Sequence, residues 1–140
     1  MPSSRRGRDA GSATLELVLL TPLLVLLALV VMALGRITDA RVRVEDAAHQ
    51  AARAASLTYD GRQTEQAATE AAASALSTDG PGCHTRTVRL RHSALRPDST
   101  VTATVTCRTQ LRDLLGARLP GAVDITASST SPVDRYRSSP

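Results

Sequence analysis

A single carboxylate meets a long apolar run near the N-terminus of this chain. Glu16 directly precedes residues 17–34, which read LVLLTPLLVLLALVVMAL and carry no charge. A charge at the centre of a membrane helix costs ~2.5–3.5 kcal/mol on insertion scales, and less near the interface. If the chain were cut after Gly11, Ser12 would carry a free α-ammonium group. The ammonium of a neighbouring subunit could then neutralise Glu16 in low dielectric and fix the register between subunits.

A second interpretation of Glu16 needs no partner. Near the start of a helix the helix dipole favours an anion, and water is close at the membrane surface. Both interpretations of the carboxylate stay open at this point.

Two cysteines, Cys83 and Cys107, are the other residues with clear chemical potential. A disulfide between them fits an exported domain and would contribute roughly 3 kcal/mol in the chain-entropy model. The alternative is zinc held by these cysteines with His84 and His92, since four N/S ligands suit that metal. Adjacent Cys83 and His84 would point to opposite faces of a strand, however, and no C-x-x-C pair exists. We therefore expect a disulfide, no metal and no cofactor.

Composition argues against catalysis and against nucleic-acid binding. The chain has two Tyr, no Phe and no Trp, so an aromatic-lined pocket for a small-molecule substrate is not expected. Its net charge of +4 comes from scattered arginines without the aromatic platforms that single-strand binders use. No nucleophile elbow, P-loop or HExxH pattern is present, and His49 falls on the polar side of a predicted helix, where we expect solvent. We expect a protein that is not an enzyme.

The apolar run is long enough to cross a membrane. As a helix, its eighteen residues span roughly 27 Å, close to the hydrocarbon thickness of a bilayer. Pro22 removes a backbone hydrogen bond and is expected to kink this helix. Three arginines lie on each side of the run, so charge alone barely decides orientation. The cysteines and the Ser/Thr-rich C-terminal part favour a cytoplasmic N-terminus and an exported remainder.

Helical spacing continues beyond Gly35 to about Leu57 and returns from residue 61 to about Leu76. The first segment carries a narrow stripe of mostly alanine: Ile37, Ala40, Val44, Ala47, Ala48, Ala51 and Ala55. That stripe suits either a bundle with other subunits or packing on the chain's own second helix or sheet, and the sequence favours neither. Asp60 is the expected cap of the second helix, and residues 79–82 form a strong stop and turn.

The period of the pattern changes to two from Cys83 onward, which predicts three antiparallel strands. Residues 96–98 are the expected turn of the first hairpin, and residues 111–119 suit a short helix ended by Pro120 and Gly121. Cys83 has the opposite parity to the inward residues of its strand, so the disulfide requires an irregular strand start.

The fold class is α+β: a long N-terminal transmembrane helix, a helical stalk, a second short helix and a small antiparallel sheet with one face covered by a helix. The residues expected on one face are Arg86, Val88, Leu90 and His92, then Val101, Ala103, Val105 and Cys107, then Val123, Ile125 and Ala127.

The sequence around the carboxylate resembles a known family. Gly11, then Ser12-Ala-Thr-Leu-Glu16, then a long apolar helix, looks like the cleavage region of type IV prepilins. Residues 8–22 and 41–53 resemble the TadE/TadG-like minor pilins, or pseudopilins, of the tight-adherence (Flp) pilus, and residues 131–137 resemble the tail of some members. One departure is Leu17, where the pilin pattern often has an aromatic residue.

The resemblance implies a chain organised for membrane assembly. Residues 1–11 would be a basic leader removed by a prepilin peptidase between Gly11 and Ser12, and 12–35 the transmembrane helix. Residues 36–79 would form a helical extracytoplasmic segment and 80–140 the β portion. The implied protein is a single-pass protein of the cytoplasmic membrane whose partners are lipid and other pilus-assembly subunits. The alternative is a small secreted or anchored binding domain exported by a signal sequence in residues 1–34.

Overall fold

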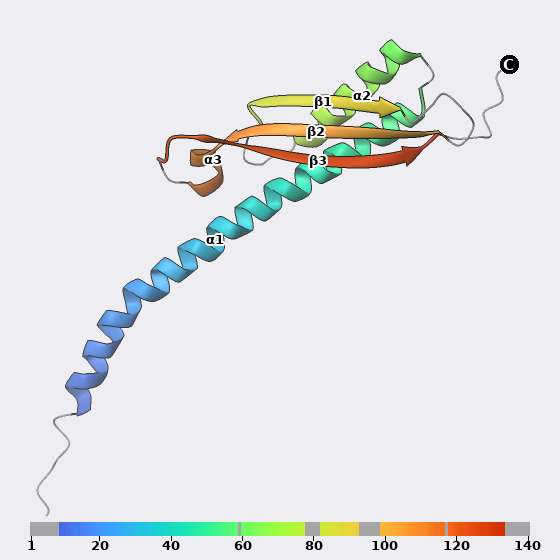
Figure 1. Ribbon diagram of the computed structural model, residues 1–140. Helices are drawn as coiled ribbons and strands as arrows, with labels where there is room; N and C mark the ends of the chain where they lie inside the picture. Colours follow the sequence, from blue (N-terminus) through green and yellow to red (C-terminus); the bar gives the residue numbers. More distant parts are fainter. Residues whose placement is uncertain (1–8, 59, 78–81, 93–98, 117, 134–140) are drawn as a thin grey trace, which may run out of the picture. The chain divides into compact units, whose positions relative to one another are not determined.

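The computed structural model describes residues 9–58, 60–77, 82–92, 99–116 and 118–133, with side chains from Leu15 onward. The elements are α1 (Asp9–Ser56), α2 (Gly61–Leu76), β1 (Thr85–His92), β2 (Thr100–Gln110), α3 (Leu111–Leu115) and β3 (Ala122–Pro132), shown in Figure 1. This order confirms the α+β prediction. The chain divides into two compact units, Met1–Gly35 and Arg36–Pro140, and α1 contributes residues to both.

The sheet has the order β1-β2-β3 with both pairs antiparallel. Val88 lies opposite Val105, and Val105 lies opposite Ala127, so the inward residues of the three strands share one face as predicted. Thr109 of β2 is buried on the covered side, whereas the even-numbered threonines of this strand point to the other face. There they form hydroxyl pairs with β3: Thr102 with Thr130, Thr104 with Ser128 and Thr106 with Thr126.

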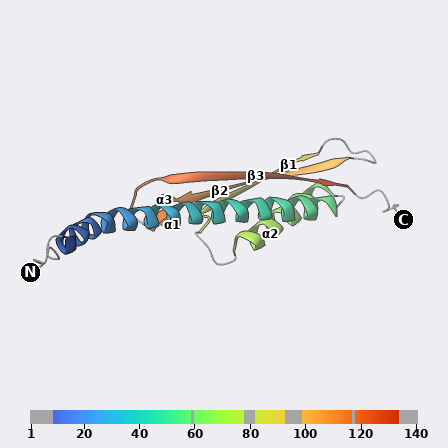
Figure 2. The same ribbon diagram turned by 90° about the horizontal axis from the view of Figure 1, so that it is seen from below.

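Two helices cover the inward face of the sheet. The part of α1 that follows Arg36 and the whole of α2 lie along this face (Figure 2). Of the fourteen buried hydrophobic residues in the described part of the chain, nine are alanine. Small side chains let the helices approach the sheet closely, although each one buries little area. The stripe from Val44 to Ala55 is therefore part of one core with the chain's own second helix and sheet, whereas Ile37 stays 40% exposed. This answers a question that the sequence left open.

Local sequence explains where the two long helices are separated. The carboxylate of Asp60 accepts a hydrogen bond from the Arg62 N–H at 3.3 Å, which confirms Asp60 as the N-cap of α2. The Thr64 hydroxyl donates to the Asp60 carbonyl at 2.8 Å and lies 2.9 Å from the Thr58 hydroxyl. Thr64 is buried, so these bonds tie the start of α2 to the end of α1.

The short helix ends earlier than the sequence predicted. Leu111 and Leu114 lie in α3, but Leu119 does not, and Pro120 and Gly121 do not end the helix. Instead Gly116 takes the left-handed conformation at φ 66°, and its N–H donates to the Arg112 carbonyl at 2.9 Å. A left-handed glycine directly after a helix terminates it at little steric cost.

Several other predictions, on residues 1–8, 79–81, 96–98 and 134–140, lie outside the described residues.

Candidate functional site

The predicted processing site lies in the first turns of α1. The helix begins at Asp9, so the backbones of Gly11 and Ser12 are both helical. Glu16 follows about one turn later with an exposed side chain. Cleavage after Gly11 and the pairing of Glu16 stay predictions, because they concern the processed chain and a second subunit.

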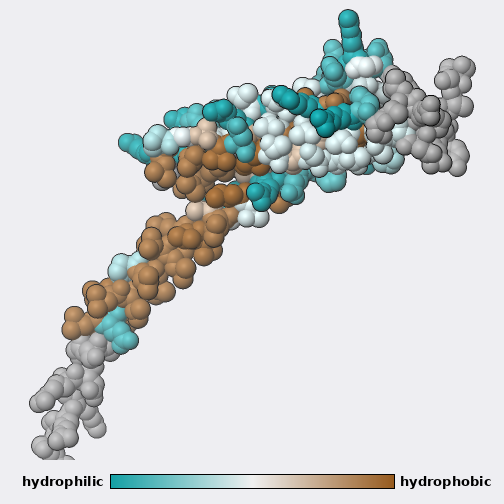
Figure 3. All heavy atoms as spheres, in the orientation of Figure 1, coloured by the Kyte–Doolittle hydropathy of each residue, from teal (hydrophilic) through white to brown (hydrophobic). Residues whose placement is uncertain are grey.

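The large apolar side chains of the run lie exposed on the described part of the helix. The helix described over Leu15–Ser56 contains a stretch long and apolar enough to cross a membrane, and that stretch is wholly unburied by the rest of the chain. Its large side chains are exposed throughout, for example Leu19 at 74% and Met32 at 62%. Figure 3 shows the same surface as a mostly brown band with a few teal or pale atoms along it. Exposed apolar surface of this extent fits lipid or a protein partner.

Pro22 lies inside α1, and the helix continues through it. The preceding hydroxyl, of Thr21, donates to the Leu17 carbonyl at 2.6 Å. Such a bond inside a helix satisfies the hydroxyl in an apolar setting. The kink expected at Pro22 stays a prediction.

The second predicted pair is joined in the structure. Cys83 and Cys107 form a disulfide with their Cα atoms 5.5 Å apart. Cys83 precedes the first residue of β1, and the His84 N–H donates to the Arg108 carbonyl at 2.9 Å just outside the regular strand. The irregular strand start that the disulfide requires is therefore present.

The alternative zinc set is not assembled. Both cysteines are used in the disulfide, and the His84 Nε2 atom lies 2.9 Å from an Asp113 carboxylate oxygen. No group of three or more His, Cys, Asp or Glu side chains that could hold a metal ion occurs among the described residues.

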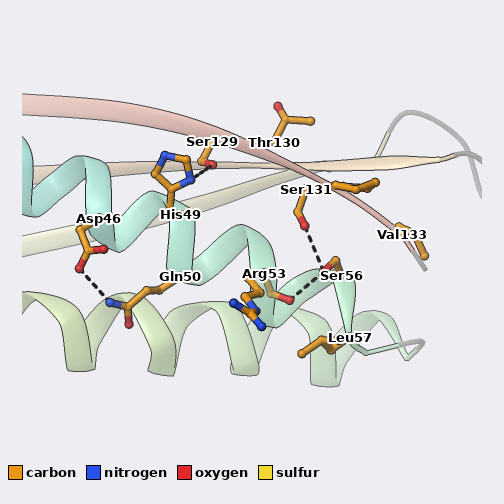
Figure 4. Close-up of a pocket in the computed structure, with 11 residues that line it drawn as sticks. Asp46, His49, Gln50, Arg53, Ser56, Leu57, Ser129, Thr130, Ser131 and Val133 are labelled. Atoms are coloured by element: carbon orange, nitrogen blue, oxygen red, sulfur yellow. Dashed lines mark hydrogen bonds between the residues drawn. The ribbon is translucent and has the colours of Figure 1, made fainter.

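A wide groove of about 810 Å³ runs between the last turns of α1 and the end of β3 (Figure 4). His49 was expected in solvent; its side chain is exposed, but its Nδ1 atom lies 2.8 Å from the Ser129 hydroxyl. The nearby Asp46 carboxylate accepts a hydrogen bond from the Gln50 amide at 2.8 Å. Among the described contacts, that carboxylate is thus engaged with an amide rather than with the imidazole. The contact between His49 and Ser129 therefore joins β3 to α1.

The sequence contained a signal for this contact that was missed. Ser129 has the same parity as Ile125 and Ala127, so an alternating strand places it on the covered face. It is 7% exposed. A buried hydroxyl needs a hydrogen-bond partner. A polar side chain on the helix that covers this face could therefore have been predicted as the partner of Ser129.

Comparison with family models gave a match to TadE-like protein over residues 11–53. Comparison with curated proteins and with solved structures gave no match. The matched residues contain Glu16, the whole apolar run and most of the alanine stripe. Over residues 11–53 the chain is therefore similar to the TadE-like family, as the sequence predicted, and its one described membrane-length helix fits the single-pass anchor of a Tad-associated membrane protein.

Proposed function

We propose that this protein is a TadE-like minor pilin, or pseudopilin, that takes part in assembly of a Tad/Flp-type pilus. Its work is packing of its N-terminal helix against other subunits in the cytoplasmic membrane rather than chemistry on a substrate. A prepilin peptidase removes residues 1–11, the new N-terminus stays at the cytoplasmic side, and Arg36 to the C-terminus is exported.

The observation that carries this proposal is the difference in burial between the two parts of α1. Beyond Arg36 the small residues of the helix are buried against the chain's own sheet, so that surface is already occupied. From Leu15 to Leu34 the large apolar side chains are all exposed. Helix–helix packing with other subunits therefore has the membrane segment available to it and not the alanine stripe.

Glu16 gives that packing a register. Its carboxylate is exposed between Leu15 and Leu17, which are both 67% exposed. Lipid offers no hydrogen bonds to such a group, and an ammonium from Ser12 of a processed neighbour would neutralise it. The pair forms only when two subunits stand side by side with a fixed axial offset.

Co-purification of pilus-assembly subunits with the full chain tests the proposal. Glu16→Ala and Glu16→Gln remove the charge at the membrane boundary. The matched control is Glu45→Ala, which removes an exposed carboxylate from the same helix beyond the membrane segment. We expect the Glu16 variants to reach the membrane fraction normally but to lose recovery of partner subunits at least roughly tenfold, equivalent to about 1.4 kcal/mol. Full recovery with both Glu16 variants would show that the carboxylate needs no partner and would contradict the proposal.

A further inference from the structure

A second apolar surface lies on the exported unit, around α3. A groove of about 390 Å³ is lined by side chains of α1, α3 and β3, namely Ile37, Arg41, Leu111, Leu114, Leu115, and residues 123–126. Two of its large hydrophobic lining residues are exposed, Ile37 at 40% and Val123 at 41%. Leu119, in the segment that follows α3, is also exposed, at 47%. In Figure 3 hydrophobic surface gathers at the end of the sheet that carries α3.

Leu119 lies between two residues, Leu111 and Gly121, that a backbone hydrogen bond joins. The Leu111 N–H donates to the Gly121 carbonyl at 3.0 Å, which closes the loop that holds Leu119. Leu114 anchors α3 with 3% exposure. The Arg36 guanidinium lies against Gly116, since a Cβ there would come 2.6 Å from Arg36 Nη1. The side chain of Arg36 thus lies beside Gly116, the residue that ends α3.

Chain connectivity places Ile37, one residue of this groove, close to the end of the apolar run. Ile37 follows the last residue of the apolar run, Leu34, by three positions, which is about 4.5 Å along a helix axis. The headgroup layer on each side of the hydrocarbon core is roughly 5–7 Å deep. Whatever contacts Ile37 therefore lies at headgroup depth when residues 17–34 cross the bilayer.

The charges around the groove suit anionic lipid. Arg41 lines the groove. Three more exposed arginines belong to α3 or lie near its end: Arg112 within it, Arg118 two residues after Gly116, and Arg36, whose guanidinium lies against Gly116. The neighbouring carboxylates already face cations or a histidine, because Asp113 contacts His84 at 2.9 Å and Asp124 lies 3.9 Å from Arg108. Arginines at the membrane surface attract anionic headgroups while adjacent apolar side chains insert among the acyl chains.

We propose that the α3 surface, formed by Ile37, Leu119, Val123 and these arginines, inserts into the headgroup layer of the leaflet where the membrane helix emerges. Its occupant is phospholipid with anionic headgroups. The proposal depends on residues 17–34 crossing a membrane but not on Glu16 or on pilus assembly. It gives the exported unit a second attachment to the bilayer beside the helix itself.

The absence of tryptophan from the chain makes a direct test possible. Leu119→Trp introduces a single tryptophan, whose emission is excited selectively over that of the two tyrosines. Leu57→Trp is the matched control. Leu57 is 50% exposed, close to the 47% of Leu119, but it lies at the far end of α1. The full chain is reconstituted in phosphatidylcholine vesicles containing phosphatidylglycerol, with a fraction of lipids brominated near the top of the acyl chain.

We expect the tryptophan at position 119 to emit at shorter wavelength and to lose roughly half of its intensity to brominated lipid, as a side chain at the acyl boundary does. The tryptophan at position 57 should keep its intensity. Arg118→Gln in the Leu119→Trp background should reduce the quenching, whereas Arg62→Gln, an exposed arginine on α2, should leave it unchanged.

Two outcomes would overturn the inference. One is emission from position 119 that is unquenched or quenched no more than at position 57, in chains whose circular dichroism matches wild type. The other is a blue shift at position 119 that disappears when protein is diluted in the same lipid, since a second copy and not lipid would then cover the surface. Loss of co-assembly in Glu16 variants has no bearing on either readout, so the two proposals fail separately.

Discussion

The Ser129 hydroxyl lies 2.8 Å from Nδ1 of His49, a contact that joins strand β3 to helix α1 across 80 residues of sequence. Ser129 is buried, whereas His49 stands at the rim of a solvent-filled groove. The contact holds the edge strand of the sheet against the helix that continues toward the membrane segment. It is a polar contact beside a hydrophobic core that consists largely of alanine.

Removing this hydroxyl should destabilise the exported unit. Ser129→Ala breaks a hydrogen bond on the covered face, so we expect the free energy of unfolding to fall by about 1 kcal/mol. Ser128→Ala is the matched control: the same substitution one residue earlier, on the open face, where Ser128 is exposed and pairs with Thr104. Water can replace that bond, so we expect a loss of only a few tenths of a kcal/mol.

Urea titration of the full chain in detergent, followed by circular dichroism, measures both values. Equal losses for the two variants would mean that the His49 contact contributes no more than an exposed hydroxyl pair.

Gly116 should resist substitution although it lies at the surface. Gly116→Ala must hold φ at +66° and place a methyl group 2.6 Å from Arg36 Nη1. The left-handed backbone alone costs roughly 1 kcal/mol for a residue with a Cβ. The side chain of Arg36 must also move. We expect a lower melting temperature for this variant.

Gly61→Ala is its control, because nothing lies within 4 Å of a Cβ at that first position of α2 and its φ is not in the left-handed range. Alanine favours helix, so a neutral or slightly raised melting temperature is expected there. If the melting temperature of Gly116→Ala were equal to or higher than that of Gly61→Ala, the contact of Arg36 with Gly116 would be contradicted.

The disulfide should carry much of the stability of the sheet. Cys83 and Cys107 enclose a loop with a sequence separation of 24, for which the chain-entropy model gives roughly 3 kcal/mol. Cys83→Ala with Cys107→Ala should therefore lower the free energy of unfolding by about that amount in non-reducing buffer. Dithiothreitol should bring the wild-type chain close to the double variant and leave the variant itself unchanged. A wild-type melting curve that is insensitive to the reductant would contradict this prediction.

Period-two alternation was enough to predict the sheet faces. Val88, Val105 and Ala127 fall opposite one another in the register, as their parity requires. The disulfide was also predictable, because the chain has two cysteines and an irregular start of β1 was the one condition needed. Glycine and capping signals placed α2 correctly.

Other features depend on tertiary packing that a local pattern does not encode. The alanine stripe is equally suited to a subunit bundle or to a sheet. Its burial became evident only from the structure, where Ala48 and Ala51 belong to one buried cluster with residues of α2 and β2. The end of α3 was placed too late because the leucine spacing continues to Leu119, whereas the backbone turns at Gly116. Alternation along β3 could place the Ser129 hydroxyl on the covered face, but it could not identify His49, 80 residues away in sequence, as its partner.

The central claim concerns the amine that would face Glu16. Intact-mass spectrometry of the protein purified from membranes of cells that express the pilus-assembly system measures where the mature chain begins. We predict a chain that begins at Ser12, either unmodified or N-methylated, because this residue then supplies the ammonium next to the apolar helix. A chain that begins near Leu34 or Arg36 would have lost Glu16 and the membrane helix together, and would contradict assembly through them.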